Sequence, residues 1–174
     1  PMGCYRQIEE GFSGVELVDI TSQFVSLRFI KSPWEREQIR SAFRLADFAY
    51  QAMKEAVEPG VSEIRVAAAG EYAARSRGAN GFGFSAIIGS GARSNAVVPT
   101  ASSKELQAGE LVMIGISPKV AGYAGVVGDT LPVSGTYTAS QQVCIDHLKK
   151  AFQLAKAGLV PGKTGREIDA PVRA

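Results

Sequence analysis

GELVMIGISPKVAGYAGVVGDTLPVSG, residues 109–135, sets the architecture of this chain. Its first part, Leu111–Ile116, is an unbroken apolar run of the kind that forms a strand covered on both faces. A second strand is predicted over Tyr123–Leu131, and Ser117–Gly122 supplies the proline and glycine of a turn between them. The stretch therefore predicts a hairpin at the centre of an α+β fold.

A long helix is predicted before the hairpin. Ser32 can cap it, Pro33 suits the first helical position because its missing N–H costs nothing there, and Glu35 completes a capping box. The helix is expected to run to about residue 57, with one apolar face directed at the core. That face is predicted to consist of Ile39, Phe43, Ala46, Tyr50, Met53 and Val57.

The pattern of a long helix, Pro-Gly and a capped helix occurs twice. The first copy leads through residues 57–62, VEPGVS, into a helix over 63–77 that Ser62 caps. The second follows a helix from Ser140 or Thr138 to about Lys156, with Val143, Leu148, Phe152 and Ala155 expected to face inward. It continues through residues 160–164, VPGKT, where Thr164 and Glu167 form another capping box. This is the signature of an internal repeat.

Composition and charge exclude several classes. The chain has 174 residues, 45% of them apolar, and a net charge of +2, too small to indicate a nucleic-acid or membrane-surface partner. No apolar run approaches the roughly 20 residues that span a bilayer, and the N-terminus as given has no apolar signal core. Cys4 and Cys144 are interpreted as free thiols, and His147, the single histidine, as a solvated helix residue. A cytoplasmic protein is expected.

The hairpin resembles the pita-bread enzymes: creatinase, aminopeptidase P, prolidase and methionine aminopeptidase. Their pattern, roughly LVLIDFG…YxGYxSDITRT, matches residues 111–130 without a gap, and residues 30–47, IKSPWEREQIRSAFRLAD, resemble the helix that precedes it. The resemblance implies helices packed on a curved, mainly antiparallel sheet. It also implies that residues 1–31 are the tail of an N-terminal domain or a linker, with short β-like pieces at Val15–Ile20 and Phe24–Ile30. Residues 32–174 would be the first half of the pita-bread domain, with the second half just begun at 158.

The metal ligands of this family are missing. Its metal-dependent members hold two divalent ions with two hairpin aspartates eleven residues apart, and those positions fall on Gly115 and Val126. The loop that carries the family's histidine reads ARSNAVVPTASS over 92–103, which places Ala96 or Val98 at the histidine position. Glycine-rich residues 81–91, GFGFSAIIGSG, fit a family strand, whereas a phosphate-binding loop would need a following GK[ST]. No metal or other cofactor is expected.

Creatinase shares the fold without the metals and uses a histidine of the second half, and its hairpin turn resembles residues 118–123, PKVAGY. The leading hypothesis is therefore a metal-independent hydrolase of a small amidino, amide or peptide C–N bond. Its catalytic base would lie outside this segment, which alone is expected to be inactive. The residues expected to contact substrate are Phe82, Phe84, Asn95, Tyr123 and Asp129, with Val126 at the pocket floor.

Two alternatives remain open. One is a non-catalytic pita-bread module that binds a peptide or protein partner, and the other is a metal-dependent Xaa-Pro peptidase. Fold cannot separate them, because function resides in the site. The expected partners are a small-molecule or peptide substrate and a second copy in a homodimer, without nucleic acid or membrane. Residues 1–174 are expected to be a fragment of a longer chain.

Overall fold

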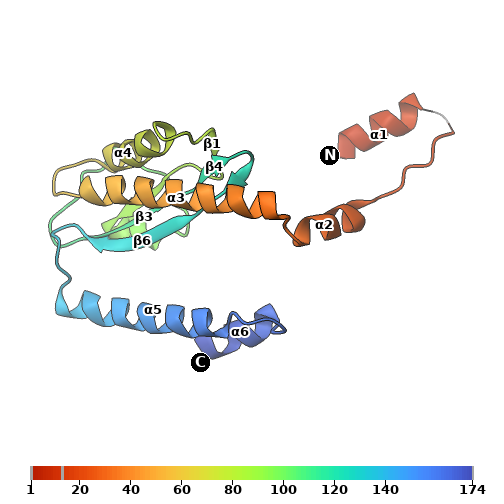
Figure 1. Cartoon of the computed structure of the whole chain (residues 1–174). Coiled ribbons are helices and arrows are strands. Elements are labelled where there is room, and N and C mark those ends of the chain that lie inside the picture. Colours follow the sequence, from red (N-terminus) through yellow and green to blue (C-terminus); the bar gives the residue numbers. More distant parts are fainter. Residues whose placement is uncertain (1, 13, 174) are drawn as a thin grey trace. The chain divides into compact units, whose positions relative to one another are not determined.

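The computed structural model describes residues 2–12 and 14–173 as an α+β protein (Figure 1). Its contacts divide the chain into two units, residues 1–37 and 38–174, and each is described by itself. The division falls inside helix α3 (Pro33–Glu55), a few residues after the join expected from the sequence. The side chain of Cys4 lies outside what the structure describes.

The first unit contains α1 (Met2–Gly11) and α2 (Thr21–Phe29). The prediction of a β-like piece at Phe24–Ile30 was wrong, and Val15–Ile20 forms no strand. A strand needs a neighbour for its backbone N–H and C=O groups, whereas a helix satisfies most of them internally. Asp19 favours the helix further, because its carboxylate accepts the Thr21 N–H at 2.8 Å.

Helix α3 begins as predicted. The Glu35 N–H donates to Ser32 Oγ at 3.2 Å and the Ser32 N–H donates to Glu35 Oε2 at 2.6 Å. The predicted apolar face was rotated by about one residue, because Ala46 and Met53 are buried but Phe43 is 46% exposed. The buried face of α3 consists of Ala42, Leu45, Ala46, Ala49 and Met53. Its small residues let other segments approach the helix closely.

Helix α4 (Glu63–Arg75) follows, with the Ser62 side chain accepting the Arg65 N–H at 3.4 Å as the predicted cap. Helices α3 and α4 lie over one face of the sheet (Figure 1). Gly70 allows their close contact, because a Cβ at this position would overlap the Met53 side chain. The resulting core joins apolar residues of both helices to Ile88, Val112, Ile114 and Ile116 of the strands.

Within residues 2–12 and 14–173, six short strands form two antiparallel sheets. The first has the order β2-β3-β6, from Ile87–Ser90, Leu111–Ile116 and Val127–Pro132. The second has the order β1-β4-β5, from Gly81–Phe82, Pro118–Val120 and Tyr123–Ala124. The predicted strand Leu111–Ile116 is confirmed.

The predicted strand Tyr123–Leu131 is instead divided between β5 and β6, and the predicted turn contains β4. The break has a steric cause at Gly125. A Cβ at this position would overlap the α3 backbone at Ala42 and Phe43. Only a glycine therefore lets the chain pass this close to the helix. The contact fixes the point at which β6 begins.

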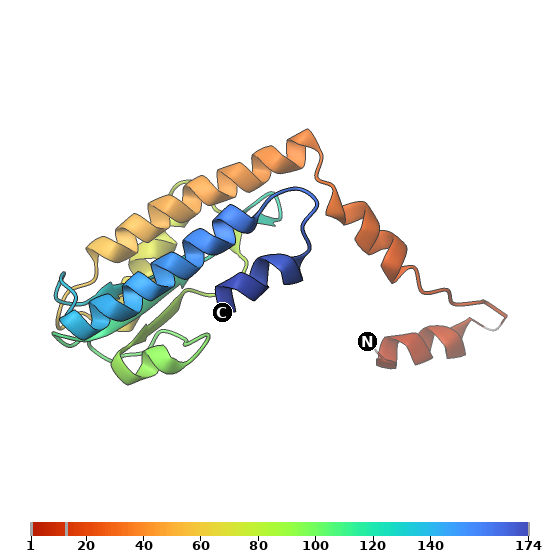
Figure 2. The same ribbon diagram turned by 90° about the horizontal axis from the view of Figure 1, so that it is seen from below.

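The chain ends with α5 (Ala139–Gly158) and α6 (Gly165–Arg173), which folds back along α5 (Figure 2). Thr138 caps α5 in a capping box with Gln141, and Thr164 and Glu167 form the predicted box of α6. The predicted inward face of α5 is not buried: Val143, Leu148 and Phe152 are 57%, 61% and 65% exposed. Among the described residues of α5, only Ile145 is buried.

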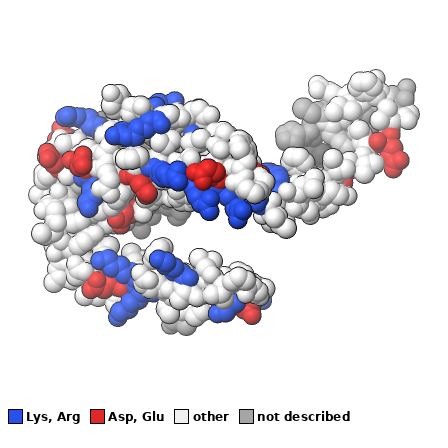
Figure 3. Space-filling model, viewed as in Figure 1, with Lys and Arg blue, Asp and Glu red and all other residues white. Residues whose placement is uncertain are grey.

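Charged side chains of both signs are interspersed over the surface of the second unit drawn in Figure 3. Arg36, Arg40 and Arg44 follow one another at helical spacing along α3, close in sequence to Glu37 and Asp47. Within the described parts of the chain, no helix is both long enough and apolar enough to cross a membrane.

Candidate functional site

The β3–β6 ladder contains Gly115 and begins directly after Val126, the two residues at the family's aspartate positions. Val112, Ile114 and Ile116 point into the core, so Met113 and Gly115 face the other way. Gly115 lies directly opposite Gly128 of β6, and Val126 precedes Gly128 by two residues. Paired residues on neighbouring strands share a face, so Gly128 lies on the same face as Gly115, and Val126 directly precedes β6.

Neither position can ligate a divalent metal. Glycine has no side chain, and Val126 offers only hydrocarbon, about half of it exposed. The backbone does not require glycine at 115, because an added Cβ would make ordinary contacts, the nearest 3.6 Å from Ile87 Cβ. Between residues 2 and 173, apart from undescribed Ser13, no three His, Cys, Asp or Glu residues gather at one point. The donor set therefore does not fit the dinuclear centre that the resemblance implies.

A hollow of about 710 Å³ surrounds β6, which is an edge strand of the β2-β3-β6 sheet. It is here called the β6-edge hollow. One part of its wall comes from the β2-β3-β6 sheet and from the loop residues Phe84 and Val97. The other part comes from α3, Tyr137 and α5. The sheet-side residues are Phe84, Ile87, Val97, Met113, Val126, Gly128 and Thr130. The helix-side residues include Tyr50, Lys54, Asp129, Tyr137, Ile145, Leu148, Lys149 and Phe152. A mainly apolar wall with a few polar groups suits a small organic ligand.

Asp129 is the acidic residue of this wall. Its Oδ2 accepts a hydrogen bond of 2.7 Å from Tyr50 Oη, and its Oδ1 accepts the Thr130 N–H at 2.8 Å. Tyr137 Oη donates to the Thr130 carbonyl at 2.8 Å. Burial, followed by the hydrogen bond and charge of Asp129, raises the pKa of Tyr50 to about 12. Burial and the Asp129 charge also raise the pKa of Tyr137. Both phenols are therefore neutral donors at physiological pH.

The loop after β2 forms the rim of the hollow. It begins with the short helix η1 (Gly91–Asn95) and carries Val97, which is 90% exposed and lines the hollow. Further along, Pro99 lies on β2, and a Cβ at Gly89 would be 2.6 Å from Pro99 Cγ. Neither Ala96 nor Val98, the two candidates for the family's histidine position, offers a polar side chain.

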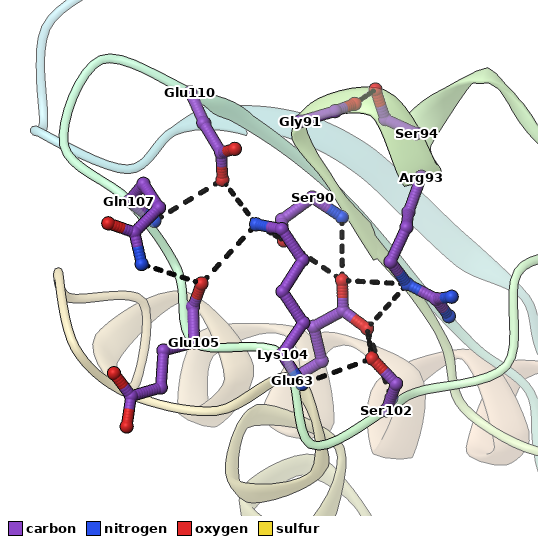
Figure 4. A network of polar contacts seen from close by, with 10 residues as sticks. All are labelled: Glu63, Ser90, Gly91, Arg93, Ser94, Ser102, Lys104, Glu105, Gln107 and Glu110. Carbon is purple, nitrogen blue, oxygen red and sulfur yellow. Dashed lines mark hydrogen bonds and ion pairs between the residues drawn. The ribbon is translucent and has the colours of Figure 1, made fainter.

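Glu63, at the start of α4, lies at the centre of a polar network below this loop (Figure 4). Its fully buried carboxylate accepts hydrogen bonds from Ser90, Ser102 and Arg93. The sequence indicated Ser62 as a cap but gave no sign that the next residue is buried. Its partners lie 27 to 39 residues further along the chain.

Three of the predicted pocket residues, Phe84, Val126 and Asp129, line the β6-edge hollow, but Asp129 lies opposite Ile114 and so points to the face of β6 opposite to that of Gly128. Three others lie elsewhere. Phe82, in β1, has the Arg75 guanidinium 4.8 Å from its ring centroid. Tyr123 pairs with Val120 in the β4–β5 ladder, and Asn95 is an exposed residue of η1. Whether any of the six contacts a substrate stays a prediction.

Cys144 and His147 of α5 do not line the hollow. Cys144 is exposed as a free thiol. His147 is also exposed, and its Nδ1 lies 2.7 Å from the Val143 carbonyl, one turn earlier on the helix. Position and partners give neither residue a role at the hollow.

The chain matches known proteins over most of its length. The sequence model of metallopeptidase family M24 matches residues 37–174. The uncharacterized peptidase YqhT of Bacillus subtilis is 33% identical over 178 residues, covering 98% of this chain and 48% of that protein. Creatinase of a Bacillus species is 29% identical over 162 residues, covering 88% and 39%. A prolidase structure from Pyrococcus furiosus superposes with a TM-score of 0.94 at 30% identity, covering 99% and 51%. The chain thus spans about half the length of these relatives, or less.

Proposed function

The chain belongs to metallopeptidase family M24, and from its two missing carboxylates we propose that it contributes part of the substrate site of a metal-independent hydrolase. The observation that carries this proposal is that the family's two aspartate positions fall on Gly115 of β3 and on Val126, directly before the neighbouring strand β6, and that neither residue can bind a metal. The proposed substrates are small amidino, amide or peptide compounds with a hydrolysable C–N bond.

In this proposal the described residues bind and orient the substrate. Phe84, Met113 and Val126 give the sheet side of the β6-edge hollow an apolar wall, which favours a dry substrate surface. Asp129 can accept a hydrogen bond from a cationic or amide N–H group of the substrate. Hydrolysis also needs a group that accepts the proton of water and returns it to the leaving nitrogen. We expect that group outside residues 1–174.

The metal question can be tested directly. The full-length protein in which this segment is expected to lie, purified without chelator, would be analysed for metals and assayed with creatine and with Ala-Pro, with and without EDTA. We expect less than one metal per chain and hydrolysis of at least one compound at a rate that EDTA leaves unchanged. Two metals per chain with EDTA-sensitive hydrolysis would instead establish the metal-dependent Xaa-Pro peptidase, which the peptidase names among the relatives favour.

The pocket assignment has a matched pair of variants. Phe84 lines the β6-edge hollow and Phe82, two residues earlier, does not. For whichever compound binds by calorimetry, Phe84→Ala should weaken affinity by about tenfold or more through lost apolar contact. Phe82→Ala should leave affinity unchanged. Equal effects of the two variants would place the ligand elsewhere.

A non-catalytic binding module remains the second candidate, favoured by the exposed apolar side chains of α5, including Val143, Leu148 and Phe152. It predicts binding of a peptide without turnover of either compound. The homodimer and the cytoplasmic location are also proposals, and size-exclusion chromatography with light scattering tests the first.

A further inference from the structure

One carboxylate holds both ends of the loop at the rim of the β6-edge hollow. Glu63 Oε1 accepts the Ser90 N–H and Oγ–H, each at 2.9 Å. Glu63 Oε2 accepts the Ser102 N–H at 3.0 Å and its Oγ–H at 2.7 Å. Ser90 ends β2, and Ser102 follows the loop, so the 91–101 segment leaves and returns at the same side chain (Figure 4).

The same carboxylate also contacts the interior of the 91–101 segment. Arg93 Nε lies 3.3 and 3.1 Å from the two Glu63 oxygens, and Arg93 Nη2 donates to the Thr100 carbonyl at 2.6 Å. Lys104 supports the other side of the network, because its Nζ donates to Ser90 Oγ at 2.9 Å and to Glu110 Oε2 at 2.6 Å. The segment is thus tied at both ends and across its middle.

The Glu63 carboxylate is suited to this role because it stays charged. Burial alone would raise its pKa, but the hydrogen bonds from Ser102 and Ser90 outweigh burial and hold the pKa below the ordinary glutamate value. A buried carboxylate gains little net stability over a well-packed apolar residue, whereas it accepts several directed hydrogen bonds. The main effect of the Glu63 carboxylate is therefore to fix the positions of its hydrogen-bond donors.

We propose that Glu63 is a positioning residue that fixes the 91–101 segment and thereby sets where Val97 stands at the rim of the β6-edge hollow. Val97 itself is 90% exposed and has little packing to hold it. Its position therefore depends on the bond from the Ile88 N–H to the Pro99 carbonyl at 3.1 Å and on the ties of Glu63 to Ser90, Arg93 and Ser102. The interpretation of the rim as part of a substrate site rests on the proposed function. The fixing of the segment does not, and it can be measured without a substrate.

The test places a nitroxide spin label at Val97→Cys in a background where Cys4 and Cys144 are serine. Electron paramagnetic resonance then reports the mobility of position 97. Glu63→Gln should make the label clearly more mobile, because an amide can no longer accept from both serines. Ser102→Ala, which keeps the buried carboxylate and the Ser102 N–H bond, should have the same effect in weaker form. Ser102→Ala should also speed hydrogen exchange at the amides of residues 90 and 102 by roughly five- to tenfold, because it removes the Ser102 Oγ–H bond to Glu63 and the Lys104 N–H bond to Ser102 Oγ.

Ser94→Ala is the matched control, because Ser94 lies in the same segment and donates to the Gly91 carbonyl rather than to Glu63. It should leave the label unchanged. A second label at Tyr72→Cys, an exposed site on α4, should be unaffected by any variant that remains folded. If Glu63→Gln does not fold, Ser102→Ala decides alone. An unchanged spectrum at position 97 in Ser102→Ala, or an equal change in Ser94→Ala, would overturn the proposal whatever the protein hydrolyses.

Discussion

Helices α3 and α5 begin from similar sequence patterns and reach different environments. Each is long, amphipathic and followed by Pro-Gly and a capped shorter helix. Helix α3 buries five residues against the strands, whereas α5 buries Ile145 and leaves Leu148 and Phe152 more than half exposed. An amphipathic sequence thus predicts that a helix has an apolar face. It does not show whether other described residues pack against that face.

The two walls of the β6-edge hollow also differ in how well they are packed. Its sheet side, with Ile87 and Met113, lies on the strands whose opposite face packs into the core. Its helix side includes Leu148 and Phe152, which have few neighbours among the described residues. The sheet side should therefore be the more rigid wall, and substitutions on the two sides should have unequal effects on stability.

The largest expected effect comes from the same substitution in the two helices. Leu45 of α3 is 9% exposed and Leu148 of α5 is 61% exposed. Leu45→Ala should lower the free energy of unfolding by about 2–4 kcal/mol, through lost burial and the cavity it leaves. Leu148→Ala should change it by no more than about 0.5 kcal/mol. Urea unfolding followed by circular dichroism measures both.

Equal losses in the two variants would break the comparison, because they would mean that another surface covers α5 in solution. Leu154→Ala, at a second exposed position of α5, should behave like Leu148→Ala. Repeating the unfolding at several protein concentrations separates coverage by a second copy from coverage within one chain, since only the first depends on concentration.

A smaller effect on the free energy of unfolding is expected at two glycines. Gly125 lies against α3, and Gly158 ends α5 and lies against α6. A Cβ at Gly125 would overlap the α3 backbone, which cannot move without disturbing the core, so Gly125→Ala should cost about 1–3 kcal/mol. A Cβ at Gly158, which ends α5, would lie 3.3 Å from Cγ2 of Ile168, a side chain that can rotate away. Gly158→Ala should therefore stay within about 1 kcal/mol of the parent. A larger loss at Gly158 than at Gly125 in thermal unfolding would contradict the comparison.

The sequence predicted what neighbouring residues determine. The capping boxes at Ser32 and Thr164 involve residues three apart, and Leu111–Ile116 is apolar without interruption, so all three predictions were confirmed. Contacts between distant segments were not accessible in this way. Gly125 shows it: only the approach of α3 explains why the second strand breaks there.

The candidate site shows the same limit. Gly115 and Val126 could be placed together because the hairpin register follows from short-range pairing and from the family resemblance. Alternation along a strand does not reveal which layer covers it, so Phe82 and Phe84 could not be separated from the sequence. Glu63 could not be found at all, because its burial depends on Ser90 and Ser102, which only the folded chain brings to it.

The smallest expected effect is a change in tyrosine absorbance and concerns Asp129, which interacts with one tyrosine of α3 and with another just before α5. It accepts a hydrogen bond from Tyr50 of α3 but acts on Tyr137, just before α5, through its charge. Asp129→Asn should therefore lower the pKa of Tyr50 from about 12 toward the ordinary value near 10, and that of Tyr137 by less. Near-ultraviolet absorbance of phenolate should then show more ionised tyrosine in the variant than in the parent at about pH 11.

The same pKa fixes the sign of the pH dependence. Between about pH 10 and 12 an unfolded chain loses the Tyr50 proton and the folded chain keeps it, so stability should fall as pH rises through this window. Tyr50→Phe removes the group and should flatten that fall, whereas Tyr137→Phe should flatten it less. If the two phenylalanine variants flatten the fall equally, the hydrogen bond from α3 does not distinguish Tyr50 from Tyr137. The contrast between the α3 and α5 sides would then not extend to the polar residues of the hollow.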